Sequence, residues 1–362
     1  MTTYFIVIFL IIIFAYFAQK NIIKKAASIA NEFVIIKPTM TKMFFIFIVG
    51  VLVFVAGFRY YVGTDYGAYY GQYLRFANSF WESLKNFDEP GYGLIALISL
   101  KLNLGGEGAI FIAAALTNII FLITIYKNTD MLFPATLFYI FLGCWHGGFN
   151  GVRQYLASAI IFSGLRFIKE RKFWKYALVV FIAFLFHGSA IMMIFPYFVV
   201  YNKISFKNIA FLIGLSLIIL FSFSEVLEFT GFLLQEDLSD EGEYLTNSVN
   251  TFRILVAIAP ALFFLFLYQK RTITKEQQFW FNMLILNGIV MFATSNSTYL
   301  ARVGIYTVPF STIGIPELIK GSNIKQKKAV TIIILVAFAA FWLYELSNSD
   351  GLNNFRFIFN NV

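Results

Sequence analysis

The stretch TYFIVIFLIIIFAYFAQKNIIKK, residues 3–25, decides the fold class. Its first part, 3–18, is an unbroken apolar run, and three lysines follow before residue 26. An apolar run that ends in a lysine-rich loop is typical of a helix that crosses a membrane toward the cytoplasm. No basic group precedes the run, so we predict a retained membrane span rather than a cleaved signal peptide.

The composition of the whole chain agrees with this first segment. Of 362 residues, 59% are hydrophobic and 13% are charged, whereas soluble domains carry about 25% charged residues. Apolar runs recur along the chain between short polar stretches, and a helix can satisfy its own backbone polar groups in lipid. We therefore predict an all-α fold, a polytopic membrane helical bundle of about 12 transmembrane helices in a single integral membrane domain, 1–362. The predicted spans are 3–18, 43–57, 106–126, 131–145, 152–168, 174–187, 188–201, 207–223, 251–268, 277–293, 303–319 and 329–346.

The net charge of +9 is distributed unevenly over the predicted loops. One set of loops has a net charge of +15, from 20 Lys and Arg against five acids, and the other set has −6, from eight against 14. Basic loops stay in the cytoplasm, so the charge indicates topology rather than nucleic-acid binding. Both chain ends are predicted on the outer, non-cytoplasmic face. The single cysteine, Cys144, lies within a span, so we expect no disulfide framework, no metal site and no cofactor.

Several regions depart from regular crossings. Residues 58–105 form a long first outer loop, and its apolar piece 91–104 is too short for the roughly 30 Å of hydrocarbon, which predicts a re-entrant or surface helix. The hairpins 131–168 and 174–201 are also short, so they are expected to leave an outward-facing cavity. Residues 224–250 form an acidic outer loop without EF-hand spacing, and calcium binding is not expected there.

The first outer loop is rich in tyrosine. Six tyrosines lie between residues 60 and 73, together with Asp65 and with Arg59 just before them. Aromatic faces can stack on sugar rings while carboxylate and hydroxyl groups bind sugar hydroxyls, which makes this loop a candidate glycan site. An interfacial aromatic belt is the alternative, although a belt does not require Asp65.

Two further candidates are polar residues within predicted membrane segments, where a polar side chain is energetically unfavourable. Arg153 opens a predicted span after Asn150-Gly151-Val152, and its planar fork suits a phosphate group; a snorkelling arginine at a helix end is the alternative. His187 lies in the turn of the 174–201 hairpin, where an imidazole can accept a proton at neutral pH. A hydrogen-bonded core histidine is the alternative reading. Arg302, after a polar turn, can hold phosphate or pair with an acid.

These residues together resemble a known family. The segment Arg59–Tyr73, Glu89-Pro90-Gly91-Tyr92-Gly93, Asn150–Gln154, Leu185–Ala190 and Arg302 are similar in order and spacing to the EpsG family of Wzy-like exopolysaccharide and O-antigen polymerases. The resemblance covers roughly residues 45–320. It implies a GT-C-like glycosyltransferase of the bacterial plasma (inner) membrane that joins undecaprenyl-diphosphate-linked oligosaccharide repeats at the outer face, for capsule, exopolysaccharide or O-antigen. A chain-length regulator and other polysaccharide-assembly proteins are candidate partners.

The residue roles rest on side-chain chemistry rather than on the resemblance. A diphosphate leaving group needs cations, the attacking sugar hydroxyl needs a proton acceptor, and the glycans need positioning. The diphosphate-binding candidates are Arg153, Arg302 and Arg59; the catalytic candidates are Asp65 and His187; the glycan-binding candidates are Tyr60, Tyr61, Tyr66, Tyr69 and Gln154. The main alternative is a flippase or transporter of lipid-linked oligosaccharide. An integral membrane acyltransferase would need a route for a cytoplasmic acyl donor, and a structural scaffold would not explain an arginine and a histidine at the depth of the cavity.

Overall fold

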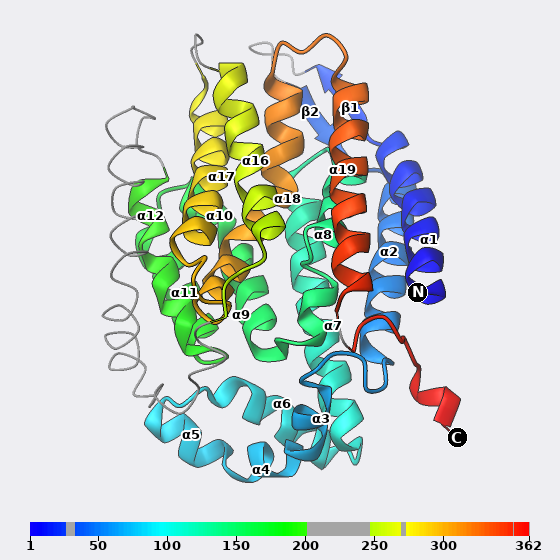
Figure 1. Ribbon diagram of the computed structural model, residues 1–362, viewed down its shortest axis with the longest axis vertical. Helices are drawn as coiled ribbons and strands as arrows, with labels where there is room; N and C mark the ends of the chain where they lie inside the picture. Colours follow the sequence, from blue (N-terminus) through cyan, green and yellow to red (C-terminus); the bar gives the residue numbers. More distant parts are fainter. Residues whose placement is uncertain (27–32, 201–246, 269–272, 350, 362) are drawn as a thin grey trace.

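The chain forms a bundle of helices, most of them running along the long axis of the molecule (Figure 1). The computed structural model describes residues 1–26, 33–200, 247–268, 273–349 and 351–361. The first half contains α1 (Thr2–Lys20), β1 (Ile23–Ala26), β2 (Phe33–Ile36), α2 (Thr39–Gly57), α3 (Tyr66–Gly71), α4 (Tyr73–Asn78), α5 (Phe80–Asn86), α6 (Pro90–Lys101), α7 (Gly105–Asn128), α8 (Leu132–Phe141) and η1 (His146–Phe149). The predicted span 207–223 and most of the acidic loop 224–250 lie outside the described residues.

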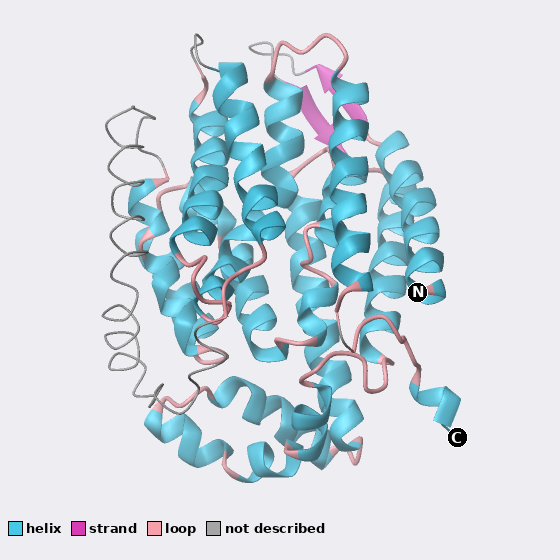
Figure 2. Ribbon diagram, viewed as in Figure 1, coloured by secondary structure: helices cyan, strands magenta, loops and turns pink. Residues whose placement is uncertain are grey.

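The second half continues the bundle. It contains α9 (Val152–Ser163), α10 (Leu165–Lys169), α11 (Phe173–Phe184), η2 (Gly188–Ile194), α12 (Pro196–Val199), α16 (Thr251–Tyr268), α17 (Lys275–Ala293), η3 (Leu300–Val303), α18 (Gly304–Gly321), α19 (Lys327–Ser347) and η4 (Ile358–Asn361). Within the described ranges, strand is confined to the antiparallel pair β1–β2 (Figure 2).

Five of the described helices are long and apolar enough to cross a membrane: α1, α2, α7, α16 and α19. In α1, Val7 and Ile11 are buried, whereas Phe5, Ile6 and Phe9 are exposed. Large apolar side chains on an outer surface are stable in lipid but costly in water. The prediction of an all-α membrane protein is therefore confirmed. The number of twelve spans and the GT-C-like architecture stay predictions.

The segment 58–105 forms a layer across one end of the bundle. Helices α3, α4, α5 and α6 lie there, at the lower end in Figure 1, where the C-terminus also lies. Helix α6 has 12 residues, so it is about 18 Å long and shorter than the hydrocarbon core. The C-terminal segment pairs with the start of this layer, because Gly63 N donates to Gly351 O and Tyr60 N donates to Arg356 O, both at 2.9 Å.

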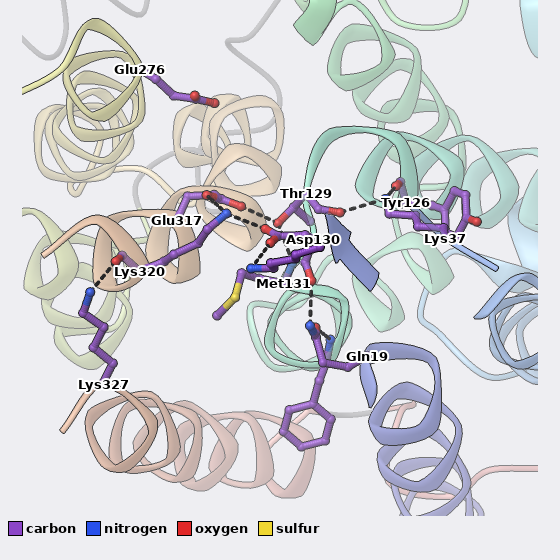
Figure 3. Close-up of polar contacts among 12 residues, drawn as sticks. Gln19, Lys37, Tyr126, Thr129, Asp130, Met131, Glu276, Glu317, Lys320 and Lys327 are labelled. Carbon is purple, nitrogen blue, oxygen red and sulfur yellow. Dashed lines mark hydrogen bonds and ion pairs between the residues drawn. The ribbon is translucent and has the colours of Figure 1, made fainter. Parts of the chain in front are cut away.

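The opposite end of the molecule is held together by a buried carboxylate, Asp130, in the turn between α7 and α8 (Figure 3). Its side chain is 1% exposed, and its two oxygens lie 2.5 Å from Lys24 Nζ and 2.5 Å from Lys320 Nζ. Gln19 Nε2 donates to the Asp130 carbonyl at 2.7 Å. One turn therefore connects α1, the strand β1 and α18.

A second lysine attaches the β-hairpin to the same turn. Lys37 Nζ donates to Thr129 O at 2.9 Å and also to the Tyr126 carbonyl. These carbonyls end α7, where a cation is stabilised by the helix dipole. Thr129 Oγ1 in turn donates to Glu317 Oε1 at 2.6 Å. Lys24 and Lys37, which follow the first span, are thus both bound to the end of α7 and the turn after it.

Replacing Asp130 with asparagine is expected to destabilise the protein by about 1–2 kcal/mol. The value is below that of a fully buried pair because the lysine side chains are 47% and 37% exposed and can turn toward water. Burial raises the pKa of Asp130, but the hydrogen bonds from Lys24 and Lys320 hold it below its ordinary value. The stabilisation is therefore present above the unfolded-state pKa and is lost as the pH falls through the folded-state pKa.

Thermal unfolding of the purified protein measures this effect. The difference between wild type and Asp130→Asn should be constant from about pH 5 to 8 and should shrink in acid. Glu170→Gln is the control, because Glu170 forms its pairs with Arg166 and Lys172 at the surface. An equal destabilisation in both variants would contradict the assignment.

Candidate functional site

The start of α9 is positioned by the first outer loop. Gly63 has φ +100°, and a Cβ there would lie 2.4 Å from the Phe149 carbonyl oxygen, so this close approach requires glycine. The next residue, Thr64, donates its N–H to Asn150 Oδ1 at 2.9 Å. Arg153 follows in the first turn of α9. The loop and the turn before α9 therefore form one unit.

Glu89 lies at the centre of a polar cluster beside α9. It is the N-cap of α6, with Pro90 as the first helical residue, and its φ of +42° is in the left-handed region. A non-glycine residue in this region is strained and often marks a functional position. The strain is offset by contacts, because Gly91 N donates to Leu185 O at 2.7 Å and a Cβ on Gly91 would lie 2.4 Å from the Phe186 ring.

The Glu89 carboxylate binds groups from two other elements. Its Oε2 lies 2.6 Å from Arg153 Nη1 of α9. Its Oε1 accepts the Gly188 N–H at 2.6 Å and lies 2.9 Å from His187 Nδ1. Arg153 Nε also donates to the Tyr69 hydroxyl at 3.3 Å. We call Glu89, Arg153, His187 and Tyr69 the Glu89 cluster.

The electrostatics of the Glu89 cluster favour an ionised carboxylate. Burial raises the pKa of Glu89, but the neighbouring His187, the charge of Arg153 and the Gly188 N–H together hold it below the ordinary value of 4.5. An anion at Nδ1 orients the imidazole and leaves Nε2 to act on a substrate. The side chains of Arg153 and His187 are 33% and 28% exposed, so a substrate can reach both.

A cavity lies on a different face of α9. Its volume is about 420 Å³, and Gly151, Gln154 and Tyr155 of α9 line it together with Arg302. Gln154 Nε2 donates to the Arg302 carbonyl at 3.1 Å. Further polar lining comes from His146, Asn150, Arg253, Asn287, Thr298, Ser311, Glu345 and Ser349. The cavity is therefore polar on part of its wall and is a second candidate binding site.

The structure brings some of the predicted residues together and separates others. Arg153, His187 and Tyr69 meet in the Glu89 cluster, whereas Arg302 and Gln154 line the cavity. Arg153 and Arg302 therefore lie on different sides of α9 and do not share one anion site. The observed cavity is enclosed by α9, α16, α18 and α19. It therefore does not lie between the hairpins 131–168 and 174–201, where the outward-facing cavity was expected.

Arg59 does not reach either site. It is 1% exposed, Nε donates to the Val62 carbonyl at 3.2 Å, and Nη1 donates to the Ala56 carbonyl. Its guanidinium lies 4.9 Å from the centre of the Phe149 ring. The cation instead ties the end of α2 to the turn before α9. Burial lowers the pKa of Arg59 to about 10, with Tyr66 opposing that shift, so the group stays charged at neutral pH.

The tyrosines of the first outer loop pack largely on one another. Ring centres lie 4.9 Å apart for Tyr60 and Tyr61 and 5.0 Å apart for Tyr61 and Tyr66. Tyr66 is 1% exposed and Tyr61 is 51% exposed, so Tyr61 is the ring best placed to meet a ligand. Asp65 precedes α3, is half-buried and accepts from Thr64 Oγ1 at 3.0 Å. It is not part of the Glu89 cluster.

Glu89 is a residue of the candidate site that the sequence alone does not assign to a site. It belongs to one of the motifs that resemble the family, but an acid in an outer loop is ordinarily solvated. The sequence signal that remains is its place directly before Pro90-Gly91, a pair that can end a turn and begin a helix. Among the residues that the structure describes, no three His, Cys, Asp or Glu side chains gather as a metal site would require.

Most of the chain matches the sequence pattern of a known family. The sequence pattern of the EpsG family matches residues 42–359, which include the Glu89 cluster and all described residues of the cavity. The chain belongs to the EpsG family. The suspected resemblance is thereby confirmed, and membership indicates a membrane protein of the polysaccharide-polymerase type. No curated protein and no solved structure matches this EpsG-family chain.

Proposed function

We propose that this EpsG-family protein is a glycosyltransferase that joins oligosaccharide repeats carried on undecaprenyl diphosphate at the outer face of the bacterial plasma membrane. The observation that carries the proposal is the Glu89 cluster, in which one carboxylate lies 2.6 Å from a guanidinium nitrogen and 2.9 Å from an imidazole nitrogen. Such a group can bind an anionic leaving group and accept a proton in one place.

The proposed reaction is a single displacement. The bond between the donor's anomeric carbon and its diphosphate oxygen breaks, and a bond to a hydroxyl oxygen of the acceptor repeat forms. Arg153 takes up the charge that develops on the departing diphosphate. His187 Nε2 accepts the hydroxyl proton, and Glu89 stabilises the resulting imidazolium through Nδ1. One displacement inverts the anomeric centre. Asp65 is the second candidate for the base.

The α3–α6 layer is proposed to position the glycans. It contributes Tyr69 and Glu89 to the cluster, and Tyr60 and Tyr61, before α3, offer partly exposed rings. The C-terminus lies at this end of the molecule, and the Met1 amino group donates to Asn353 O of the C-terminal segment. Lys24, Lys37 and Lys320 bind Asp130 and its neighbours at the other end (Figures 1 and 3). The positive-inside rule supports the proposal that the layer and both termini lie outside. A chain-length regulator is a candidate partner there.

The size distribution of surface polysaccharide in a deletion strain tests the function. A lost polymerase leaves single repeats on the cell, and complementation with the wild-type chain restores long polymer. Absence of all surface repeats would instead indicate a flippase, the alternative function. Incubation of the purified protein with lipid-linked repeats provides the direct measurement, because polymer and free polyprenyl diphosphate should appear in step.

A further inference from the structure

A buried tyrosine of α18 holds the turn that carries His187. Tyr306 is in the first turn of α18 and is 0% exposed. Its hydroxyl lies 3.0 Å from Ser189 Oγ, and either group can be the donor. Ser189 follows His187 and Gly188 directly. Because a buried hydroxyl without a partner is costly, this hydrogen bond ties Ser189 to α18.

The turn needs contacts from other elements because its backbone leaves the helix here. His187 N still donates to Ala183 O of α11 at 3.1 Å, but the His187 backbone is extended, with φ −157° and ψ 123°. On one side, the Gly188 N–H donates to Glu89 Oε1 at 2.6 Å. On the other side lies Tyr306. Two hydrogen bonds from distant parts of the chain therefore hold the residues that follow the imidazole.

Helix α18 is well anchored where Tyr306 leaves it. The residue before it, Ile305, accepts a hydrogen bond at its carbonyl from Ser158 Oγ of α9 at 2.7 Å. The residue after it, Thr307, is 1% exposed and donates from Oγ1 to Asn287 Oδ1 of α17 at 2.8 Å. A side chain that starts from a backbone fixed on both sides can hold a neighbouring turn with little play.

A second buried tyrosine provides an internal comparison. Tyr176 of α11 is also 0% exposed, and its hydroxyl donates to Met193 O at 2.8 Å. Both tyrosines therefore hydrogen-bond η2, but they do so at opposite ends of it. The hydroxyl of Tyr306 is at the end next to His187, whereas that of Tyr176 is at the end away from it.

We propose that Tyr306 is a positioning residue for the glycosyl transfer, acting through Ser189 on the turn that carries His187. It keeps the imidazole and the Gly188 N–H against the Glu89 carboxylate. The inference rests on the proposed function, in which His187 Nε2 accepts the proton of the attacking hydroxyl. Tyr306 is buried and does not touch the substrate. A base that is held less firmly transfers the proton more slowly, so the effect should appear in turnover rather than in substrate binding.

The variant Tyr306→Phe tests the proposal, because it removes the hydroxyl and keeps the ring. Loss of this hydrogen bond should lower kcat for polymer formation from lipid-linked repeats about fivefold and leave KM within about twofold of wild type. Ser189→Ala removes the same bond at a half-buried residue and should have the same effect, so it carries the test if Tyr306→Phe does not fold. The double variant should be no slower than either single variant, because the two hydroxyls act as one unit.

The matched control is Tyr176→Phe, which removes a buried hydroxyl from the far end of η2; its kcat should stay within about twofold of wild type. Amide hydrogen exchange around Gly188 gives a measurement that needs no turnover. Exchange should be about fivefold faster in Tyr306→Phe and Ser189→Ala and unchanged in Tyr176→Phe.

Three results would overturn the inference: wild-type kcat in Tyr306→Phe and Ser189→Ala, an equal loss of kcat in Tyr176→Phe, or unchanged amide exchange around Gly188 in the first two variants. A loss that appears in KM alone would also contradict it, because a positioning residue for the base acts on turnover. A failure of the proposed function is distinct from these results. It would appear as wild-type protein that makes no polymer, while amide exchange still reports whether Tyr306 holds the turn.

Discussion

Replacing Glu89 with glutamine is expected to slow polymer synthesis about a hundredfold or more. The carboxylate faces donors on both oxygens, with Gly188 N–H and His187 Nδ1 at Oε1 and Arg153 Nη1 at Oε2. An amide of the same shape must direct its NH₂ group at a donor in either orientation. The substitution also removes the negative charge that stabilises an imidazolium, so both the geometry and the electrostatics of the cluster are lost.

The measurement is the initial rate of polymer formation from lipid-linked repeats by purified protein. Glu82→Gln is the matched control, because Glu82 is an exposed acid on α5 in the same layer; its rate should stay within about twofold of wild type. The pKa of Glu89 lies below its ordinary value, so at neutral pH the comparison is between an ionised carboxylate and an uncharged amide. Retention of half the wild-type rate would remove Glu89 from the mechanism.

Hydropathy and charge were sufficient to locate most of the helices. The expected spans 43–57 and 106–126 correspond to α2, Thr39–Gly57, and α7, Gly105–Asn128, because long apolar runs have few alternatives in lipid. The strands β1 and β2 were not expected. The segment that forms β1 contains Lys24, and its composition is typical of a loop. Lys24 forms an ion pair with Asp130, a residue more than a hundred positions away, so local sequence could not predict this contact.

The 188–201 segment shows a different limit. It was expected to be one span, but it forms the 3₁₀ helix η2 and the short helix α12, with Pro196 as the first residue of α12. Apolar composition predicts burial in lipid, yet it does not distinguish an α-helix from a 3₁₀-helix. Here Gly188 begins the segment, and its N–H binds Glu89 instead of continuing α11. A contact from another element thus decided the local structure.

The site residues that could be predicted from the sequence are those whose polar side chains are energetically unfavourable within an apolar segment. Arg153 and His187 stood out because each interrupts an apolar run. Glu89 did not, since its role depends on a left-handed turn that joins three segments far apart in sequence. The division of Arg153 from Arg302 and the burial of Arg59 were also not predictable. Helix rotation and packing direction, rather than residue type, determine which cations face one another.

Replacing Arg153 with alanine is expected to reduce polymer synthesis about a hundredfold to a thousandfold. Arg153→Lys keeps the charge but loses the planar fork that contacts Glu89 and Tyr69 together, so it should restore only a small part of the rate. Arg75→Ala is the control, because Arg75 is an exposed arginine on α4 in the same layer. A wild-type polymer length and rate in Arg153→Ala would contradict the phosphate assignment.

The double variant Arg153→Ala/Glu89→Gln separates two roles of the arginine. If Arg153 acts only by holding Glu89 in place, the double variant should be as slow as Glu89→Gln and no slower, because the two residues then act as one unit. If the guanidinium also binds the departing diphosphate, the double variant should be slower than Glu89→Gln by about tenfold or more. The side chain of Arg153 stays 33% exposed although it contacts Glu89 and Tyr69, and we therefore expect the slower rate.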